Sequence, residues 1–335
     1  MSLRTNLGTV AVLTLVVAGC ADPSGSSPDS SAGGDGPTVS SCGRELTFAD
    51  PPERVVTLDQ SSTETLLALG LADRMVGTSN LKSRVAPEYQ AAYEEIPVIS
   101  PDIPTAEQLR EAAPDLVVSS FSEHFTRDRV GTRAELADLG LPSYVSAVDC
   151  PGANAADLTS FDRLFTDYEN LGRIFGIEDR AADLVAEQRR ATEEAAAAGE
   201  TLTEETSVVW VYSVYNDVPY VAGRGGMPDA MGELAGLTNV FDDVDELWPE
   251  VSWEEVAARD PDVIVVGDLS ERGTPGDSAE EKLAMMRDHP VVSQLPAMRE
   301  NRIIEVPGIE MDPSVRTVDA LGVLVEGLRD LGHVR

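Results

Sequence analysis

The sequence predicts an α/β protein made of two Rossmann-like lobes with mainly parallel sheets, joined by a long connecting α-helix. From residue 54 onward, short apolar runs alternate with segments of helical pattern. The middle of the chain, 157–200, has helical spacing and no strand signal, and the alternation resumes after it. Strands that are apolar throughout and separated by helices are typical of parallel sheets covered on both faces.

The N-terminal lobe is expected at 42–156 and the C-terminal lobe at 201–335. The expected strands are short runs rich in Val, Ile and Leu, and two of the expected helices end at a glycine, Gly70 and Gly140, a residue that commonly terminates helices. Strands are predicted at 54–58, 75–78, 116–119, 143–145, 207–212, 219–222, 263–266 and 303–306. Helices are predicted at 63–69, 133–139, 228–234 and 315–331.

The segment 157–200 predicts the connector. Aromatic and aliphatic residues recur at helical spacing from Phe161 to Phe175, and a second, more charged helical pattern follows Gly176. We expect these residues to form a mostly helical bridge between the lobes.

The N-terminus predicts export. Arg4 precedes a short apolar stretch, which ends before it reaches the roughly 20 residues of a membrane span, so 1–19 is typical of a signal peptide. Small residues before Cys20 resemble the lipobox of bacterial lipoproteins, and 20–41, rich in Ser, Gly, Pro and Asp, predicts a lipidated tether. We therefore expect an extracytoplasmic lipoprotein anchored to the cell membrane. The alternative is an ordinary signal peptide with an incidental cysteine.

Two cysteines, Cys42 and Cys150, remain after Cys20. An oxidising compartment favours a disulfide between them, which would attach the start of the folded region to a later loop. Two free thiols or a pair of metal ligands are the alternatives.

The formal net charge of −34 argues against nucleic-acid binding and against direct contact with anionic membranes, so we expect membrane contact through the lipid anchor only. We also expect a monomeric protein. The three histidines are far apart in sequence, which disfavours a direct transition-metal site.

Two segments, 105–118 and 252–265, repeat one pattern of capped helix, Pro-Asp turn and buried strand. Thr105 with Gln108 and Ser252 with Glu255 form the capping-box pattern. Glu107 and Glu254 then occupy the second helical position of each segment. They either complement the positive helix N-terminus or form a two-point docking surface, one carboxylate on each lobe.

A series of segments occurs in a recognisable order and spacing: 53–58, 64–77, 114–118, 223–228, 235–241, 251–254, 260–264, 289–290 and 301–303. Together they resemble the iron-siderophore and cobalamin binding-protein family of ABC importers, which implies two lobes joined by a helix. One departure is Leu237, where the family more often has glycine. The resemblance implies that the chain captures cargo in the cleft between two rigid lobes and delivers it to a permease. It also implies that Glu107 and Glu254 pair with arginines of that permease.

The expected cargo is a ferric siderophore, with haem or cobalamin as alternatives, and we expect no cofactor. Ligands of open α/β sheets bind beyond the carboxyl ends of strands, and Trp and Tyr provide flat contacts for a large chelate. The alternatives are that Trp210 and Tyr212 pack a core, that Arg224 forms a structural salt bridge, and that His124 lies on the surface. The ligand-binding candidates are Gln60, Ser79, Phe121, His124, Trp210, Tyr212, Tyr215, Arg224 and Trp248, with the wider segments 59–61, 78–81, 120–125, 213–215 and 307–311 and with Tyr220 and Asp268.

An enzyme and a lipid-anchored receptor or adhesin are the rival classes. The sequence has no Gly-x-Ser-x-Gly, no Gly-x4-Gly-Lys and no Gly-x-Gly-x-x-Gly that opens a helix after a strand. No nucleophile and base can therefore be paired, and we expect no enzymatic activity. The matched glutamates favour transport over adhesion.

Overall fold

The computed structural model describes residues 36–154 and 158–334, so Cys20, the signal peptide and most of the tether lie outside the described residues. In the N-terminal lobe, five parallel strands form a sheet in the order β5-β4-β3-β6-β7. Its strands are β3 (Val55–Thr57), β4 (Met75–Ser79), β5 (Val98–Ser100), β6 (Leu116–Ser119) and β7 (Ser143–Val145), and its helices are α1 (Gln60–Ala68), α2 (Gln90–Tyr93), α3 (Ala106–Glu111) and α4 (Arg133–Asp138). The predicted parallel sheet is confirmed.

The C-terminal lobe has a second sheet in the order β10-β8-β11-β12, all parallel, with β9 added to β8 as an antiparallel hairpin. Its strands are β8 (Thr206–Tyr215), β9 (Val218–Val221), β10 (Leu237–Asn239), β11 (Val263–Asp268) and β12 (Ile303–Pro307). Its helices are α7 (Met227–Leu234), α8 (Trp253–Arg259), α9 (Ala279–Asp288), α10 (Pro296–Arg299) and α11 (Thr317–Asp330). The fold class is therefore the predicted one, α/β with mainly parallel sheets.

The connector consists of two helices, α5 (Ser160–Phe175) and α6 (Glu178–Gly199), rather than one. Gly176 ends α5 with a φ of 65°, a left-handed conformation that glycine adopts without strain. Residues in the first half of α5, such as Phe161, pack in the core of the C-terminal lobe. Ile174 and Phe175, at its end, pack in the core of the N-terminal lobe. Both lobes therefore share the apolar face of α5.

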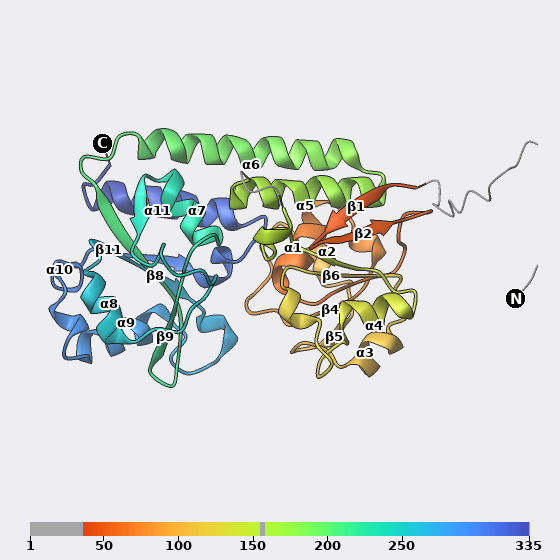
Figure 1. Ribbon diagram of the computed structural model, residues 1–335, viewed down its shortest axis with the longest axis horizontal. Helices are drawn as coiled ribbons and strands as arrows, with labels where there is room; N and C mark the ends of the chain where they lie inside the picture. Colours follow the sequence, from red (N-terminus) through yellow and green to blue (C-terminus); the bar gives the residue numbers. More distant parts are fainter. Residues whose placement is uncertain (1–35, 155–157, 335) are drawn as a thin grey trace, which may run out of the picture. The chain divides into compact units, whose positions relative to one another are not determined.

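Helix α6 is attached to both lobes, and Figure 1 shows it running above them. The guanidinium of Arg180 donates hydrogen bonds to the carbonyls of Leu69 and Gly70, at 2.6 and 3.2 Å, in the N-terminal lobe. The amide of Gln188 donates to the carbonyl of Val315, at 2.8 Å, in the C-terminal lobe. The connecting helix is thus hydrogen-bonded to the lobe on each side.

A small antiparallel hairpin, β1 (Thr38–Ser41) and β2 (Arg44–Thr47), precedes the first sheet. Strand β1 falls inside the segment 20–41 that we expected to be tether, so the folded region starts before Cys42. Cys42, in the turn of this hairpin, forms a disulfide with Cys150 in the loop after β7. The predicted pairing is therefore present in the structure and fastens the hairpin to the N-terminal lobe.

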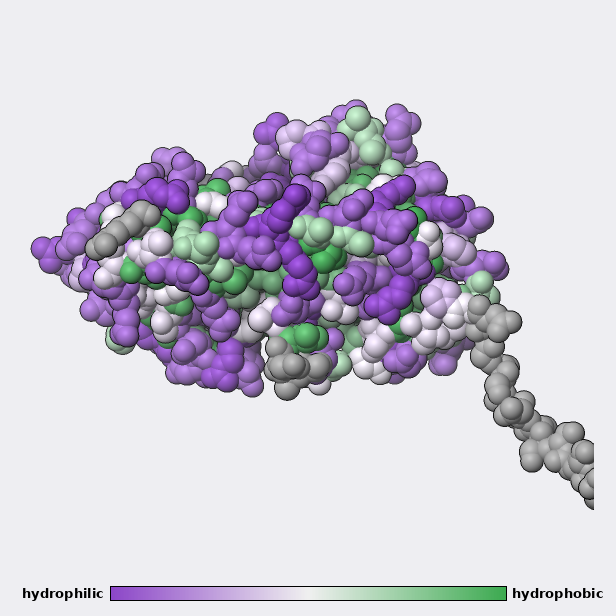
Figure 2. Space-filling view, turned by 90° about the horizontal axis from the view of Figure 1, so that it is seen from above, coloured by the Kyte–Doolittle hydropathy of each residue, from purple (hydrophilic) through white to green (hydrophobic). Residues whose placement is uncertain are grey.

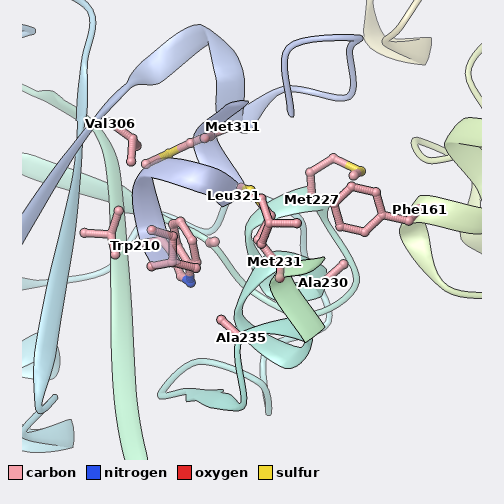
Figure 3. Close-up of a cluster of buried hydrophobic side chains, with 14 of the residues drawn as sticks. Phe161, Trp210, Met227, Ala230, Met231, Ala235, Val306, Met311 and Leu321 are labelled. Carbon is pink, nitrogen blue, oxygen red and sulfur yellow. The ribbon is translucent and has the colours of Figure 1, made fainter. Parts of the chain in front are cut away.

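The core of the C-terminal lobe lies between β8 and the helices that cover it. Figure 3 shows Trp210 of β8 among apolar side chains that include Met231 of α7 and Leu321 of α11. All three side chains are at most 1% exposed. The outer surface is different: seen from the side of α6, it is mostly hydrophilic, with apolar residues in small separate patches (Figure 2).

Candidate functional site

A cavity of about 820 Å³ lies between the two lobes, within the size range of small-molecule sites. The loop after β4 lines it on one side, and the loops after β11 and β12 line it on the other. Its walls are therefore the segments that follow the carboxyl ends of strands. The lining residues are Ser83, Arg84, Val85, Ala86, Pro87, Gln90, Asp268, Leu269, Ser270, Glu271, Pro307, Ile309 and Arg316.

Lys82 crosses the cleft beside this cavity. Its ammonium donates hydrogen bonds to the Tyr212 hydroxyl at 2.8 Å and to Oδ2 of Asp312 at 3.0 Å, and the Tyr212 hydroxyl donates to the same carboxylate oxygen at 3.2 Å. Burial alone would lower the pKa of Lys82, but the Asp312 carboxylate and Tyr212 raise it above its ordinary value. Lys82 is therefore a fixed cation that joins the two lobes.

Aromatic rings surround this ammonium. The centroids of the Phe121 and Tyr212 rings each lie 5.4 Å from Nζ of Lys82, within the range of cation–π attraction. The ring of Trp248 packs on Tyr212 with a centroid separation of 4.5 Å. Burial and the Asp312 carboxylate raise the pKa of Tyr212 to about 12, so its hydroxyl stays protonated at neutral pH. Three of the predicted aromatic residues thus meet between the lobes.

Two further ionic contacts link the lobes at the cavity wall. Glu271 accepts hydrogen bonds from the backbone N–H of Arg84 at 2.6 Å and from its guanidinium at 2.9 Å. Arg316 lies 3.6 Å from Glu64 of the N-terminal lobe and 2.7 Å from Glu310 of its own lobe. Burial raises the pKa of Glu64, and the amide of Gln60 and the Arg316 cation oppose this rise.

Gln60 and Ser79 are buried in the N-terminal lobe, where their side chains bond to backbone groups of that lobe. The Gln60 side chain accepts from the backbone N–H groups of Lys82 and Ser83 at 3.0 and 2.9 Å and donates to the Arg84 carbonyl at 3.2 Å. The Ser79 hydroxyl donates to a backbone carbonyl and is fully buried. The structure therefore gives both residues internal partners, and Gln60 holds the loop that lines the cavity.

His124 also lies inside the N-terminal lobe, with 3% of its surface exposed. Its Nδ1 is 2.9 Å from the Ser119 hydroxyl and 3.6 Å from Oδ2 of Asp59. The structure therefore places it neither on the surface nor in the cleft. Burial alone would raise the pKa of Asp59, but the His124 ring and the backbone N–H groups of Ser62 and Ser120 lower it to about 2.

The remaining candidates divide between core and surface. Trp210 is fully buried, so the structure supports the core role that the sequence left open and contradicts ligand contact. Tyr215, at the end of β8, is 62% exposed. Arg224 is exposed and its guanidinium donates to the carbonyl of Asp242, a contact to backbone and not the salt bridge considered as the alternative to ligand binding.

Glu107 and Glu254 are exposed at the second position of α3 and of α8, one on each lobe. The capping box predicted at Thr105 is confirmed. At Ser252 only half of the box forms, because the side chain of Glu255 pairs with Arg259 and does not return to the N-cap backbone.

Lys82, Arg84 and Asp312 were not among the residues predicted from the sequence. Lys82 follows by one residue the segment 78–81 that we considered, and Asp312 follows 307–311 in the same way. A lone lysine in a loop has no signal of its own, since its partner is remote in sequence. Only its position just beyond the end of a strand could have indicated Lys82 as a cleft residue.

The described residues offer neither a membrane-spanning helix nor a metal cluster. None of their helices is both long and apolar enough to cross a membrane. Within 36–154 and 158–334 there is no group of three or more His, Cys, Asp or Glu side chains arranged to hold a metal ion.

Comparison with known proteins places these features in a family. A family model described as periplasmic binding protein matches residues 55–309. A cobalamin-binding protein of Halobacterium salinarum is 28% identical over 232 residues, which cover 68% of this chain and 57% of that protein. An uncharacterized ABC transporter substrate-binding lipoprotein of Bacillus subtilis is 24% identical over 293 residues, 87% of this chain and 82% of that protein.

A solved structure supports the same relationship. The crystal structure of an ABC-type Fe3+-hydroxamate transport system from Saccharomonospora viridis is 29% identical, with a TM-score of 0.72, and the match covers 87% of this chain and 98% of that one. Because the family model matches most of the chain, and both lobes and their helical connection have the corresponding fold, the chain belongs to the periplasmic binding protein family.

Proposed function

We propose that the protein captures a ferric siderophore in the cleft between its lobes and delivers it to the permease of an ABC importer. The observation that carries this proposal is the cavity of about 820 Å³ between the lobes. The rings of Phe121 and Tyr212 flank Lys82, the residue before the lining residue Ser83, and Trp248 packs on Tyr212. A bulky chelate needs a cavity of this size and flat apolar contacts. The similarity to the Fe3+-hydroxamate transport protein supports this cargo.

Cobalamin is the second candidate cargo, favoured by the similarity to the Halobacterium protein. Cobalamin is also large and would use the same cleft. We regard both as cargo rather than as cofactors, and the protein as a binding protein without enzymatic activity.

Delivery is proposed to use Glu107 and Glu254 as docking residues. They project from the starts of α3 and α8, and Figure 1 shows both helices on the side away from α6. Charged contacts at two points would fix the orientation of the complex and speed association. His289 lies 3.8 Å from Glu254, so this carboxylate already has a polar neighbour.

Attachment to the membrane is proposed to occur through a lipid on Cys20, with the protein otherwise monomeric. The similarity to a Bacillus lipoprotein supports this arrangement. Metabolic labelling with a radioactive fatty acid tests it, because a Cys20→Ala variant must lose the label that the native chain carries.

Tryptophan fluorescence titration of the full chain tests the cargo. The panel contains ferric hydroxamate, catecholate and carboxylate siderophores, haemin and cobalamin. Saturable quenching by a siderophore at sub-micromolar concentration supports the proposal, and Trp248, which packs on Tyr212, is the expected reporter. Saturation by cobalamin or haemin alone replaces the cargo, and no response from the whole panel rejects the transport function.

A further inference from the structure

We propose that the cleft takes chelates without net negative charge and discriminates against polyanionic ones, because every cation that lines the cavity or joins the lobes beside it already faces a carboxylate. This inference rests on the proposed function, since it assigns a charge class to the cargo of the same cleft. It is independent of which neutral chelate is the natural one.

Lys82 and Arg84 are both paired across the cleft. Each of these cations comes from the N-terminal lobe and meets a carboxylate of the other lobe, Asp312 at 3.0 Å and Glu271 at 2.9 Å. The Asp312 side chain is only 2% exposed. An anionic cargo that recruited Lys82 would leave this buried carboxylate without its partner and close to a second negative charge, which is strongly unfavourable in a poorly solvated site.

At Arg316 the carboxylates outnumber the cations. Arg316 is shared between two carboxylates, Glu64 and Glu310, whose side chains are 1% and 7% exposed. One cation therefore faces two acidic groups at this wall of the cavity. Burial raises the pKa of Glu64 and of Glu310, and the Arg316 cation opposes the rise in both. This wall consequently offers an anion no unpaired cation among the described residues.

Asp268 adds another carboxylate to the lining. Its oxygens accept hydrogen bonds from neutral donors, the N–H and hydroxyl of Ser270 and the N–H of Ala279. Burial alone would raise the pKa of Asp268, but these donors lower it, so the group is ionised at neutral pH. The cavity lining thus contains two cations, Arg84 and Arg316, and two carboxylates, Asp268 and Glu271. Two further carboxylates, Glu64 and Glu310, pair with Arg316. The carboxylates therefore outnumber the cations.

Two other cations lie near the cleft and do not reverse this balance. Lys282 is fully buried, and its ammonium donates to the backbone carbonyls of Tyr212 and Gly267, both at 2.6 Å, within the C-terminal lobe. Arg272 is 3.3 Å from the buried carboxylate of Asp277. Both cations are therefore directed at partners inside their own lobe.

Iron chelates differ in net charge, so their affinities can test whether the cleft disfavours anions. Three hydroxamates neutralise the 3+ charge of ferric iron, whereas three catecholates carry six negative charges and leave the complex strongly anionic. Haem carries two propionates and belongs with the anionic ligands. The inference therefore predicts that a neutral ferric trihydroxamate, or neutral cobalamin, binds more tightly than a ferric tricatecholate or haemin.

The experiment compares the dissociation constants of a neutral ferric trihydroxamate and a ferric tricatecholate for the full chain, by fluorescence titration at fixed salt. In the native protein the tricatecholate should bind at least about tenfold more weakly. The variant Glu271→Gln frees the guanidinium of Arg84, whose side chain is 87% exposed. It should therefore improve tricatecholate affinity relative to trihydroxamate affinity by about two- to fivefold. Added salt should reduce this gain.

Glu193→Gln is the matched control, because Glu193 is exposed on α6 and the substitution changes the net charge equally. The control should leave the affinity ratio unchanged. A tricatecholate that binds the native chain as tightly as the trihydroxamate overturns the inference and leaves the transport function standing. An equal gain in Glu271→Gln and Glu193→Gln also overturns it. If neither chelate, nor cobalamin, nor haemin binds, the proposed function fails as well.

Discussion

The Nζ atom of Lys82 in the N-terminal lobe lies 3.0 Å from Oδ2 of Asp312 in the C-terminal lobe. The contact therefore joins the two lobes across the cleft. The contact is asymmetric, because the Lys82 side chain is 21% exposed whereas that of Asp312 is 2% exposed. The two partners should therefore respond differently to substitution.

Lys82→Met should lower the free energy of unfolding by about 3 kcal/mol, because it leaves the Asp312 carboxylate buried without a counter-charge. Asp312→Asn should cost less, since the lysine can turn toward water. The double variant Lys82→Met/Asp312→Asn should recover a large part of the loss, and urea denaturation of all four proteins measures the coupling. Additive effects of the two substitutions would show that the contact contributes nothing.

Asp59 should make the protein sensitive to acid. Its pKa is lowered from 3.8 to about 2, so its ionised form contributes stability that is present above about pH 4 and is lost as the pH falls toward 2. The loss should be about 2 kcal/mol. The unfolding free energy of Asp59→Asn should therefore fall less than that of the native protein between pH 5 and pH 2. Asp183→Asn, at an exposed position on α6, serves as the control and should follow the native curve.

Removal of the disulfide should destabilise the N-terminal lobe. Cys42 and Cys150 are separated by 108 residues. A cross-link that closes a loop of this length restricts the unfolded chain and so raises the free energy of unfolding by about 2–5 kcal/mol. The double variant Cys42→Ser/Cys150→Ser should unfold at correspondingly lower urea, and the native protein in reductant should match it. An unchanged midpoint in reductant, with free thiols verified by a thiol reagent, would contradict this prediction.

Charge reversal at the docking residues should separate binding from transport. Glu107→Lys and Glu254→Lys should each reduce uptake by the cognate permease about tenfold, while the dissociation constant of the cargo stays within twofold. Glu111→Lys, which alters an exposed residue of the same helix α3, is the control. Equal losses in Glu107→Lys and Glu111→Lys would indicate a general effect of charge rather than docking.

The fold was largely predictable because its elements carry local patterns. Strands β6 and β7 have the bounds expected at 116–119 and 143–145, since each is a short buried run. The connector was expected to be one long helix, although its spacing changes from apolar to charged at Gly176. In the structure Gly176, in a left-handed conformation, separates α5 from α6.

The cleft was less predictable, because contacts across it join residues that are remote in sequence. Trp210 and Tyr212 are two residues apart in β8, so their side chains lie on the same face of the strand. The sequence pattern reveals this shared face, but it does not show which part of the face a neighbouring helix covers. Trp210 lies under α7, whereas the hydroxyl of Tyr212 reaches Lys82. The ion pairs have the same origin: Lys82 and Asp312 are 230 residues apart, and no local pattern relates them.

The attachment of α6 to both lobes bears on how a membrane partner would sense occupancy. With Arg180 bonded to one lobe and Gln188 to the other, the helix acts as a spacer of fixed length. Glu107 and Glu254 would then keep nearly the same separation with or without cargo. A permease of the proposed kind would therefore have to distinguish loaded from empty molecules by the groups displayed at the cleft mouth, because the distance between its two contact points would carry no such information.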